Sequence, residues 1–354
     1  MTIKIIQGDL LSQEVDAIVN TVNCVGIMGK GIALQFKQKW PENYKAYEKA
    51  CKAKELRPGK MLVHDLGALG GKPHYIVNFP TKDHWRGKSQ IAFIEEGLKD
   101  LVTVIERLNI HSIAIPPLGC GNGGLAWDDV RSLIESYLRP LDNQLAVHLF
   151  EPSGAPAASA MVIRTARPEM TAGRAVLIKL LSLYRETGYL LSKIEVQKLG
   201  YFAHVAGVMP RLNYGKNQYG PFSYPLNKAL ERMNGHFITG VGDNDKSEAQ
   251  ISVIADAINE ADVFLQSSRE TIEKLNHIEE LIDGFESPYG MELLATVHWA
   301  AVHDANSPTP DEVTRAVYNW EPSKPAWGER KKALMQEAHI RIALERLQST
   351  RWIQ

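Results

Sequence analysis

The first 150 residues alternate short apolar segments with amphipathic segments, and this alternation restricts the fold more than any other feature of the chain. Short apolar runs are typical of strands in a layered sheet, and apolar residues at helical spacing are typical of helices that cover such a sheet. We therefore predict an α/β fold. The expected strands are 3–6, 16–20, 61–66, 75–79, 112–116 and 145–150, and the expected helices are 30–39, 42–54, 89–108 and 127–138.

A segment rich in Ala, Ser, Pro and Gly at 151–169 has no sustained period and is typical of a linker. We predict a first domain at 1–152, a linker at 153–168 and a mostly α-helical domain at 169–354. An irregular patch, 212–225, interrupts the second domain. Its expected helices are 170–187, 192–206, 224–233, 259–283, 289–304, 310–319 and 328–348.

Composition excludes several classes of protein. The 40 Lys and Arg residues nearly balance the 41 Asp and Glu residues, so any recognition of nucleic acid must be local. The three cysteines, Cys24, Cys51 and Cys120, form no C-x-x-C pair, which indicates a reducing cytoplasm rather than a disulfide framework or a zinc site. No apolar run is long enough to span a membrane, and we expect no metal and no cofactor.

Two glycine-rich segments each stand between an expected strand and an expected helix. They read "NTVNCVGIMGKGIALQ" at 20–35 and "PPLGCGNGGLAWDD" at 116–129. Glycines let backbone N–H groups approach a ligand, and a helix N-terminus behind them favours negative charge. Because the carboxyl ends of neighbouring parallel strands form a crevice, we expect a diphosphate there. Neither segment is a P-loop or a dinucleotide-binding motif.

Single polar residues near these loops have two interpretations each. Asp9 either accepts a hydrogen bond from an adenine amino group or caps a helix, and its spacing favours the cap. Asn20 and Asn23 either satisfy loop backbone or hold sugar hydroxyls. We expect Lys30 to pair with phosphate, and Cys120 to fill a position that requires a small side chain.

The combination of these motifs resembles the macrodomain, the fold that binds ADP-ribose. The matching residues are G-D-L at 8–10, A-I-V-N-x-x-N at 17–23 and G-x-G-x-G-G-L at 119–125. The resemblance implies a three-layer α/β/α mixed sheet, and it leaves the activity open between readers and several hydrolases. It implies that ADP-ribose contacts Gly8, Asp9, Leu10, Asn20, Gly29, Lys30, Gly31, Ile32, Pro117, Gly119, Cys120, Gly121, Asn122, Gly123, Gly124 and Leu125.

A lysine follows the strand in "YIVNFPTKDHWRGKSQI", 75–91. Macrodomains that remove ADP-ribose from acidic side chains or nucleic acid, the class similar to the terminal ADP-ribose glycohydrolase, carry a lysine at this place. The resemblance implies that Lys82 acts at the anomeric carbon of the distal ribose, as nucleophile or base, although a surface charge or a phosphate counter-ion would look the same. Relatives often have an aspartate in the second loop. Asn122 stands there instead, so Lys82 and Asn23 are the predicted catalytic residues.

Three features together resemble the DarG antitoxin family. They are the run "MGKGIALQFKQKWPENYKAYEKACK" at 28–52, the "FPTK…WR" stretch and the appended helical domain. That family pairs with DarT, a toxin that attaches ADP-ribose from NAD to thymidine in single-stranded DNA, and the macrodomain removes the modification.

The segments "LLSKIEVQKLGYFAHVAGVM" at 190–209 and "YGKNQYGPFSYPLNKALERM" at 214–233 are similar to SocA-like antitoxin domains, which implies that the second domain binds the toxin. A helical module that only stabilises or dimerises the protein is the alternative for this domain. Its segment 251–300 has ten acidic and two basic residues, which suits a partner with a DNA-binding cleft. A non-catalytic ADP-ribose reader and a hydrolase of ADP-ribosylated protein carboxylates are the alternatives.

Overall fold

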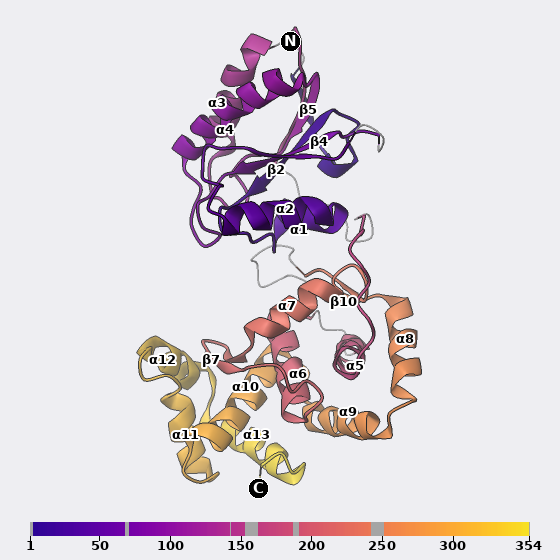
Figure 1. Ribbon diagram of the computed structural model, residues 1–354. Helices are drawn as coiled ribbons and strands as arrows, with labels where there is room; N and C mark the ends of the chain where they lie inside the picture. The colour runs from indigo at the N-terminus through magenta and orange to yellow at the C-terminus, as the bar shows by residue number, and fades with distance from the viewer. Residues whose placement is uncertain are drawn as a thin grey trace. The chain divides into compact units, whose positions relative to one another are not determined.

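The computed structural model describes residues 3–67, 71–141, 143–152, 162–186, 191–241 and 251–353. The chain forms two compact units, Met1–Ala166 and Arg167–Gln354 (Figure 1). Most of the expected linker lies outside the described residues, and the exact domain boundaries therefore stay predictions. In the part of the chain that is described, no helix is both long and apolar enough to cross a membrane.

The strands described in the first unit form one mixed sheet in the order β1-β6-β5-β2-β4-β3. Only the pairing of β3 with β4 is antiparallel among these neighbours, so β2, β4 and β5 end at the same edge of the sheet. The bounds are β1 (Ile3–Ile6), β2 (Ala17–Val22), β3 (Leu62–Asp65), β4 (Tyr75–Pro80), β5 (Ser112–Ile115) and β6 (Ala146–Phe150). Each strand overlaps one that the sequence predicts.

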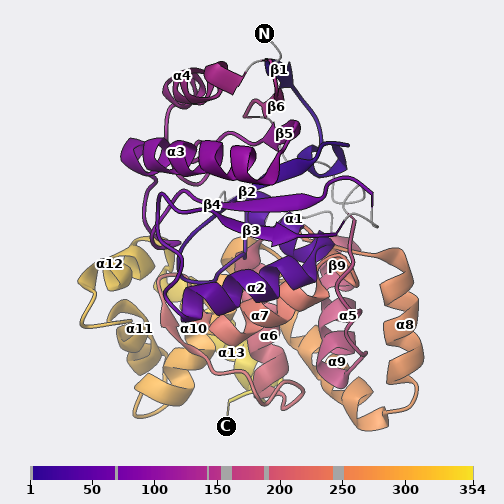
Figure 2. The same cartoon turned by 45° about the horizontal axis from the view of Figure 1, so that its top comes forward.

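Helices cover both faces of this sheet. They are α1 (Gly31–Lys39), α2 (Pro41–Lys52), α3 (Ile91–Leu108) and α4 (Trp127–Leu138). Successive side chains of a strand point to opposite faces, and Ala17 and Val19 pack in the cluster under α3 and α4, whereas Ile18 packs with Phe36 of α1. Figure 2 shows α3 on one side of β2 and β4 and α2 on the other. The predicted three-layer α/β/α architecture is confirmed.

The second unit is mostly helical, as predicted. Its helices are α5 (Ala172–Glu186), α6 (Lys193–Val205), α7 (Tyr224–Met233), α8 (Ala255–Leu265), α9 (Arg269–Ile282), α10 (Pro288–Trp299), α11 (Pro310–Tyr318), α12 (Pro325–Leu334) and α13 (Glu337–Ser349), and a π-helical turn, Ala300–Asp304, extends α10. Two short antiparallel pairs accompany them, β7 (Gly215–Asn217) with β8 (Gly220–Phe222) and β9 (Ile238–Thr239) with β10 (Ser252–Val253).

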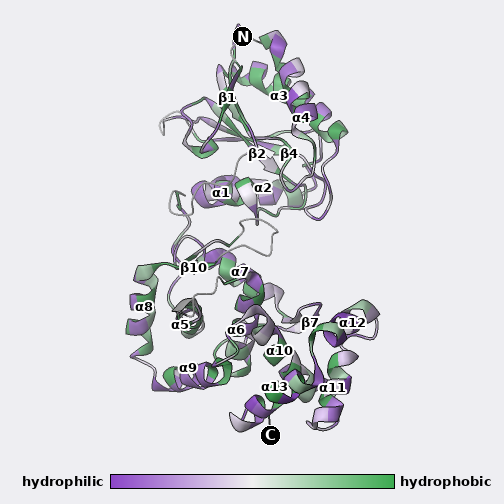
Figure 3. Cartoon of the chain, turned by 180° about the vertical axis from the view of Figure 1, so that it is seen from behind, coloured by the Kyte–Doolittle hydropathy of each residue, from purple (hydrophilic) through white to green (hydrophobic). Residues whose placement is uncertain are grey.

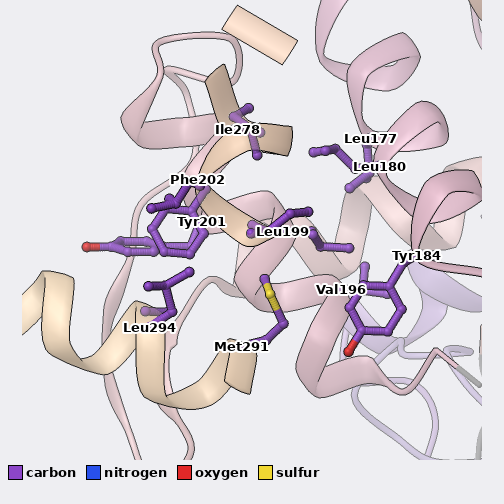
Figure 4. Packing of buried hydrophobic residues seen from close by; sticks show 14 of the residues in the cluster. Leu177, Leu180, Tyr184, Val196, Leu199, Tyr201, Phe202, Ile278, Met291 and Leu294 are labelled. Carbon is purple, nitrogen blue, oxygen red and sulfur yellow. The ribbon is translucent and has the colours of Figure 1, made fainter. Parts of the chain in front are cut away.

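Helices α6 and α10 form the centre of this unit, because nine consecutive residues of each are buried. Figure 4 shows Leu180 of α5, Leu199 of α6 and Met291 of α10 pointing toward one another. In Figure 3, peripheral helices such as α8 and α9 carry hydrophilic stretches beside hydrophobic ones, as expected for helices with one solvated face. The hydrophobic core therefore lies around α6 and α10.

Three expectations for the second unit were wrong. The predicted helix 259–283 is two helices, because the Ser268 hydroxyl accepts a hydrogen bond from the Thr271 N–H and starts a new helix. The predicted helix 328–348 is also two, because the chain is extended at Met335, whose buried side chain joins the core. The patch 212–225, predicted to be irregular, contains the β7–β8 hairpin.

Candidate active site at the ends of the central strands

The loop between β2 and α1 is organised by Asn23. The Asn23 Nδ2 donates to the Ile27 carbonyl at 2.6 Å, and its Oδ1 accepts from the Val25 N–H at 3.0 Å and from the Tyr47 hydroxyl at 3.0 Å. Burial raises the pKa of Tyr47, which keeps this hydroxyl protonated as a donor. Gly26 has φ of +82° within the same loop, a conformation that favours glycine. Both ends of the Asn23 amide are thus engaged in shaping the loop.

Asn20 lies beneath this loop in a cluster of buried asparagines. Its side chain is fully buried, and its Nδ2 donates to the Asn78 Oδ1 of β4 at 2.9 Å. Asn78 in turn donates to the Asn43 Oδ1 of α2 at 2.7 Å. The Asn20 amide is therefore inaccessible to a ligand in this structure. It supports the loop from below, and its contact with ADP-ribose stays a prediction.

Helix α1 begins at the end of the first glycine-rich loop. Lys30 is its exposed N-cap residue and has extended backbone, and Gly31 follows with φ of +57°. The first N–H groups of a helix have no partner within the helix, and they carry the positive end of its dipole. Gly31 and Ile32 therefore present backbone donors where the sequence predicts a phosphate.

The second glycine-rich loop, between β5 and α4, holds its shape only with glycines. A Cβ atom on Gly123 would lie 2.1 Å from the Gly119 carbonyl oxygen and 2.3 Å from the Ser89 hydroxyl. The Gly123 carbonyl accepts from the Ser89 N–H at 3.1 Å, and the Leu125 N–H donates to the Gly119 carbonyl at 3.1 Å. Gly119 and Gly124 both have positive φ. Gly121, Asn122 and Gly124 are the exposed members of this loop.

Cys120 lies in the same loop without features of a nucleophile. Burial raises the pKa of its thiol to about 11, so the thiol is protonated at neutral pH. The Sγ atom lies 3.5 Å from the Leu118 carbonyl oxygen. This environment agrees with the expectation that Cys120 fills a position for a small side chain.

Lys82 joins the two glycine-rich loops. Its ammonium group donates to the Asn122 carbonyl oxygen, and the Asn122 Nδ2 would lie 3.6 Å from a Cβ atom on Gly31. The Lys82 backbone is fixed as well, because the Cys24 N–H donates to the Asp83 carbonyl at 3.0 Å. The structure therefore brings the predicted catalytic lysine, the start of α1 and the second loop together.

The segment after β1 lies beside α1. The Asp9 carboxylate accepts from the Leu11 N–H at 2.9 Å and caps a short 3₁₀-helix, Leu10–Ser12, which is the interpretation that its spacing favoured. Leu10 is buried in the cluster that contains Phe36 of α1. Gly8, with φ of +118°, makes the turn before the cap. Only one carboxylate oxygen of Asp9 is used by the cap.

Sequence reasoning missed two residues that fix the site. Ser89 ties the loop after β4 to the second glycine-rich loop, and Tyr47 of α2 holds Asn23. Neither has a local sequence signal, because each acts on a residue far away along the chain. Within the described ranges, His, Cys, Asp and Glu side chains do not form a group of three or more that could hold a metal ion.

Comparisons with known proteins agree with this geometry. The family model for the Macro domain matches residues 19–134. A DNA ADP-ribosyl glycohydrolase of Thermus aquaticus is 43% identical over 345 residues, which cover 98% of this chain and 92% of that protein. A DNA ADP-ribosyl transferase-DNA ADP-ribosyl glycohydrolase fusion protein of Thermosipho africanus is 35% identical over 161 residues, 42% of each chain.

Among solved structures, the macrodomain of Mycobacterium tuberculosis DarG has 54% sequence identity, covers 43% of this chain and 98% of its own, and gives a TM-score of 0.42. The decisive finding is the similarity to the Thermus protein, because it extends over nearly the full length of both chains. The chain belongs to the DNA ADP-ribosyl glycohydrolase (DarG) family, and its N-terminal unit is a macrodomain.

Proposed function

We propose that this protein hydrolyses the bond between ADP-ribose and thymine in single-stranded DNA. The full-length similarity to a DNA ADP-ribosyl glycohydrolase supports the class of reaction. The observation that carries the proposal is the convergence of Lys82, the start of α1 and the second glycine-rich loop. This arrangement offers N–H donors for a diphosphate and an amine for the distal ribose.

In the proposed complex, ADP-ribose lies along the carboxyl edge of the sheet. The diphosphate accepts hydrogen bonds from the first N–H groups of α1, with the positive charge of Lys30 beside them. The adenine lies near Asp9, whose second carboxylate oxygen accepts from the amino group. The distal ribose and its link to thymine then lie at Lys82, at the other end of the two glycine-rich loops.

The reaction consumes one water molecule. The bond between the anomeric carbon and the thymine nitrogen breaks, positive charge develops on the ribose ring, and the departing base leaves with the electron pair of the bond and takes up a proton. Lys82 first loses its ammonium proton to solvent. The neutral amine then either attacks the anomeric carbon as a nucleophile, after which water replaces the lysine nitrogen on that carbon, or removes a proton from the water whose oxygen bonds to the anomeric carbon. The two routes differ in one intermediate, since only the first joins the lysine nitrogen covalently to the ribose.

Asn23 has a positioning role in this proposal. Its amide is used by the Val25 and Ile27 backbone and by Tyr47, so it holds the loop against which the ribose and diphosphate lie. Correct placement of the reacting groups lowers an activation barrier of this kind, by on the order of 7 kcal/mol in favourable cases. Asn23→Ala should therefore weaken ADP-ribose binding, whereas Lys82→Ala should leave that binding intact.

The test measures release of ADP-ribose from a single-stranded oligonucleotide ADP-ribosylated on thymine. We expect Lys82→Ala to lower the rate by about 100-fold or more, the scale of a lost general base or nucleophile. Lys45→Ala is the matched control, because Lys45 is an exposed lysine of α2 that pairs with Glu42. Borohydride trapping of a lysine–ribose adduct in the wild type, absent from Lys82→Ala, would identify the nucleophilic route.

Other outcomes would support the alternatives. If the wild type binds ADP-ribose and releases it from no conjugate, the protein is a reader. If it clears ADP-ribosylated glutamate peptides and spares thymidine, it is a protein-directed hydrolase. If Lys82→Ala releases ADP-ribose from the oligonucleotide at the wild-type rate, the chemistry does not depend on this lysine.

The second proposed activity is direct inhibition of a DarT-like ADP-ribosyltransferase toxin by the C-terminal unit. The relative that joins a DNA ADP-ribosyl transferase to a DNA ADP-ribosyl glycohydrolase in one chain supports such a pairing. The acidic segment 251–300 gives weaker support than its composition suggests. In the described part of the chain, several of its carboxylates already pair with cations of the same unit, among them Glu260 with Arg167 and Asp262 with Lys179.

Full-length protein carrying Lys82→Ala separates inhibition from repair. This variant is expected to lack hydrolase activity. Any loss of DNA modification when it is mixed with the toxin must therefore come from its binding to the toxin. We expect a stoichiometric amount to abolish modification by the toxin. If modification proceeds at the rate of the toxin alone, the C-terminal unit does not inhibit it, and protection depends on hydrolysis.

A cytoplasmic location is part of the proposal. Cys24, Cys51 and Cys120 are all free thiols, which agrees with a reducing compartment. Single-stranded DNA and the toxin would be encountered there. Fractionation of cells that express the protein tests this directly.

A further inference from the structure

An exposed turn that carries aromatic and basic side chains follows Lys82. The turn is closed by a hydrogen bond from the Gly87 N–H to the His84 carbonyl at 2.9 Å. Trp85 at its tip is 41% exposed. The His84 ring stacks against Trp85 with centroids 5.6 Å apart, and the Arg86 guanidinium carbon lies 4.6 Å from the Trp85 ring centroid.

The turn is held in place on both sides by the site itself. Before the turn, the Asp83 carbonyl accepts from the Cys24 N–H of the first glycine-rich loop at 3.0 Å. After it, the Ser89 N–H donates to the Gly123 carbonyl of the second loop at 3.1 Å. The exposed side chains are therefore preorganised at a fixed position beside Lys82.

Packing does not account for Trp85. It lies outside the hydrophobic clusters formed by the described residues, whereas Trp40 and Trp127 of the same unit join those clusters. A tryptophan left in water beside cations suits a ligand with flat rings and negative charge. The nearby charges agree, because the exposed Arg86 and Lys88 outnumber the single carboxylate of Asp83.

We infer that Trp85, with Arg86 stacked on it, is a platform for the nucleobase next to the modified thymine, and that Arg86 and Lys88 contact the neighbouring phosphates. This inference rests on the proposed function. If the glycosidic link lies at Lys82, the DNA strand leaves the site past the residues that follow Lys82. Stacking on an aromatic side chain tolerates any base, which suits a strand that is read by its modification and not by its sequence.

Two substrates and one binding measurement test the platform. Trp85→Ala is compared with the wild type on an oligonucleotide ADP-ribosylated on thymine and on ADP-ribosylated thymidine, which has no neighbouring base. We expect the KM for the oligonucleotide to rise about 10-fold or more with little change in kcat, and the KM for the nucleoside to stay unchanged. Trp85→Phe keeps a ring and should restore most of the oligonucleotide activity.

Binding of an unmodified single-stranded oligonucleotide gives a readout that needs no hydrolysis. Fluorescence anisotropy should show weaker binding by Trp85→Ala and a shallower salt dependence for Arg86→Gln and Lys88→Gln, by about one unit of slope each. If the wild type releases no ADP-ribose yet Trp85→Ala still weakens DNA binding, the proposed function fails, and Trp85 contacts single-stranded DNA without serving hydrolysis. If the wild type is active and Trp85→Ala matches it on the oligonucleotide, the platform fails and the function stands.

Two further outcomes would overturn the inference. An equal loss on the oligonucleotide and the nucleoside would assign Trp85 to the modified thymine itself or to loop stability. An equal loss on an ADP-ribosylated glutamate peptide would assign the turn to a protein substrate. Affinity for free ADP-ribose, measured by calorimetry, distinguishes a collapsed loop from a missing contact, because a collapsed loop would lower that affinity as well.

Discussion

Two lysines of the described residues, one in each unit, donate to a backbone carbonyl beside a glycine, and they differ in exposure. Lys82 donates to the Asn122 carbonyl and is partly exposed. Lys198 of α6 donates to the Pro221 carbonyl of β8 at 2.7 Å and is 1% exposed. The hydrogen bonds are alike, and accessibility separates the two. A substrate can approach Lys82, whereas the described structure encloses Lys198.

Lys198 also shows why a perturbed pKa does not identify a catalytic lysine. Burial, followed by the charge of Lys331, lowers the pKa of Lys198 to about 7. Such a value is typical of catalytic lysines, and it also arises in structural networks. Here the lysine holds the β7–β8 hairpin against α6. In the C-terminal unit, the buried Lys198 therefore stabilises the fold. In the macrodomain, Lys82 is partly exposed beside the glycine-rich loops.

A second group of buried charges in the C-terminal unit surrounds Glu292 of α10. The Glu292 carboxylate accepts from Arg330 at 2.6 and 3.1 Å and from the fully buried Lys331 at 2.6 Å. Burial raises the pKa of Glu292, but the hydrogen bonds and charges of these two cations lower it by more. Removing the carboxylate would leave a buried cation without its partner.

Glu292→Ala should produce the largest effect. We expect the C-terminal unit to lose about 3–5 kcal/mol of its free energy of unfolding, because Lys331 stays buried without its counter-charge. Chemical denaturation measures the loss, and release of ADP-ribose by the macrodomain should persist. Glu273→Ala is the control, since Glu273 forms an exposed pair with Arg269 and should change stability by less than about 0.5 kcal/mol. Equal effects of the two substitutions would show that burial does not make the Glu292 ion pairs more important for stability than the Glu273 pair.

Gly123→Ala tests the second glycine-rich loop of the macrodomain, which lies beside the exposed lysine Lys82. A methyl group at Gly123 would overlap the Gly119 carbonyl oxygen at 2.1 Å, so the second loop must shift. We expect ADP-ribose affinity, measured by calorimetry, to fall about 10-fold, which corresponds to about 1.4 kcal/mol. Gly215→Ala is the control, because a Cβ atom there meets nothing within 4 Å and Gly215 belongs to the second unit, so ADP-ribose affinity should stay unchanged. If Gly123→Ala binds normally, this loop does not shape the ADP-ribose site.

The smallest expected effect is the pH dependence that Lys198 gives to the second unit. Its folded pKa, about 7, is below the ordinary 10.5, so the unfolded state binds more protons between these values and stability rises with pH through this window. The slope is at most about 1.4 kcal/mol per pH unit for one proton. Relative to Lys198→Met, in which Lys331 and Glu292 remain, the wild type should gain about 1 kcal/mol of stability from pH 7 to pH 8. Parallel curves for the two proteins would show that Lys198 is not the titrating group.

Local sequence patterns determined the macrodomain well. Strands buried on both faces appear as apolar runs such as 75–79, and amphipathic helices such as 127–138 have the expected period, so each element could be located before any packing was known. The glycine-rich loops were also visible, because the conformations they adopt need glycine. The position of Lys82 followed from family resemblance and not from spacing.

Tertiary contacts decided what those patterns could not. The break between α12 and α13 has no Gly or Pro, and it depends on the tyrosines Tyr289 and Tyr318, whose hydroxyls donate to the carbonyls of Leu334 and Met335. Asn20 and Asn23 look equivalent in the sequence, yet the alternation of β2 buries one under the loop and the end of the strand leaves the other to shape it. Sequence alone therefore determined the elements of the macrodomain and its glycine-rich loops. Only the folded chain determined the helix breaks of the second unit and which polar groups are accessible, because accessibility depends on partners far apart in the sequence.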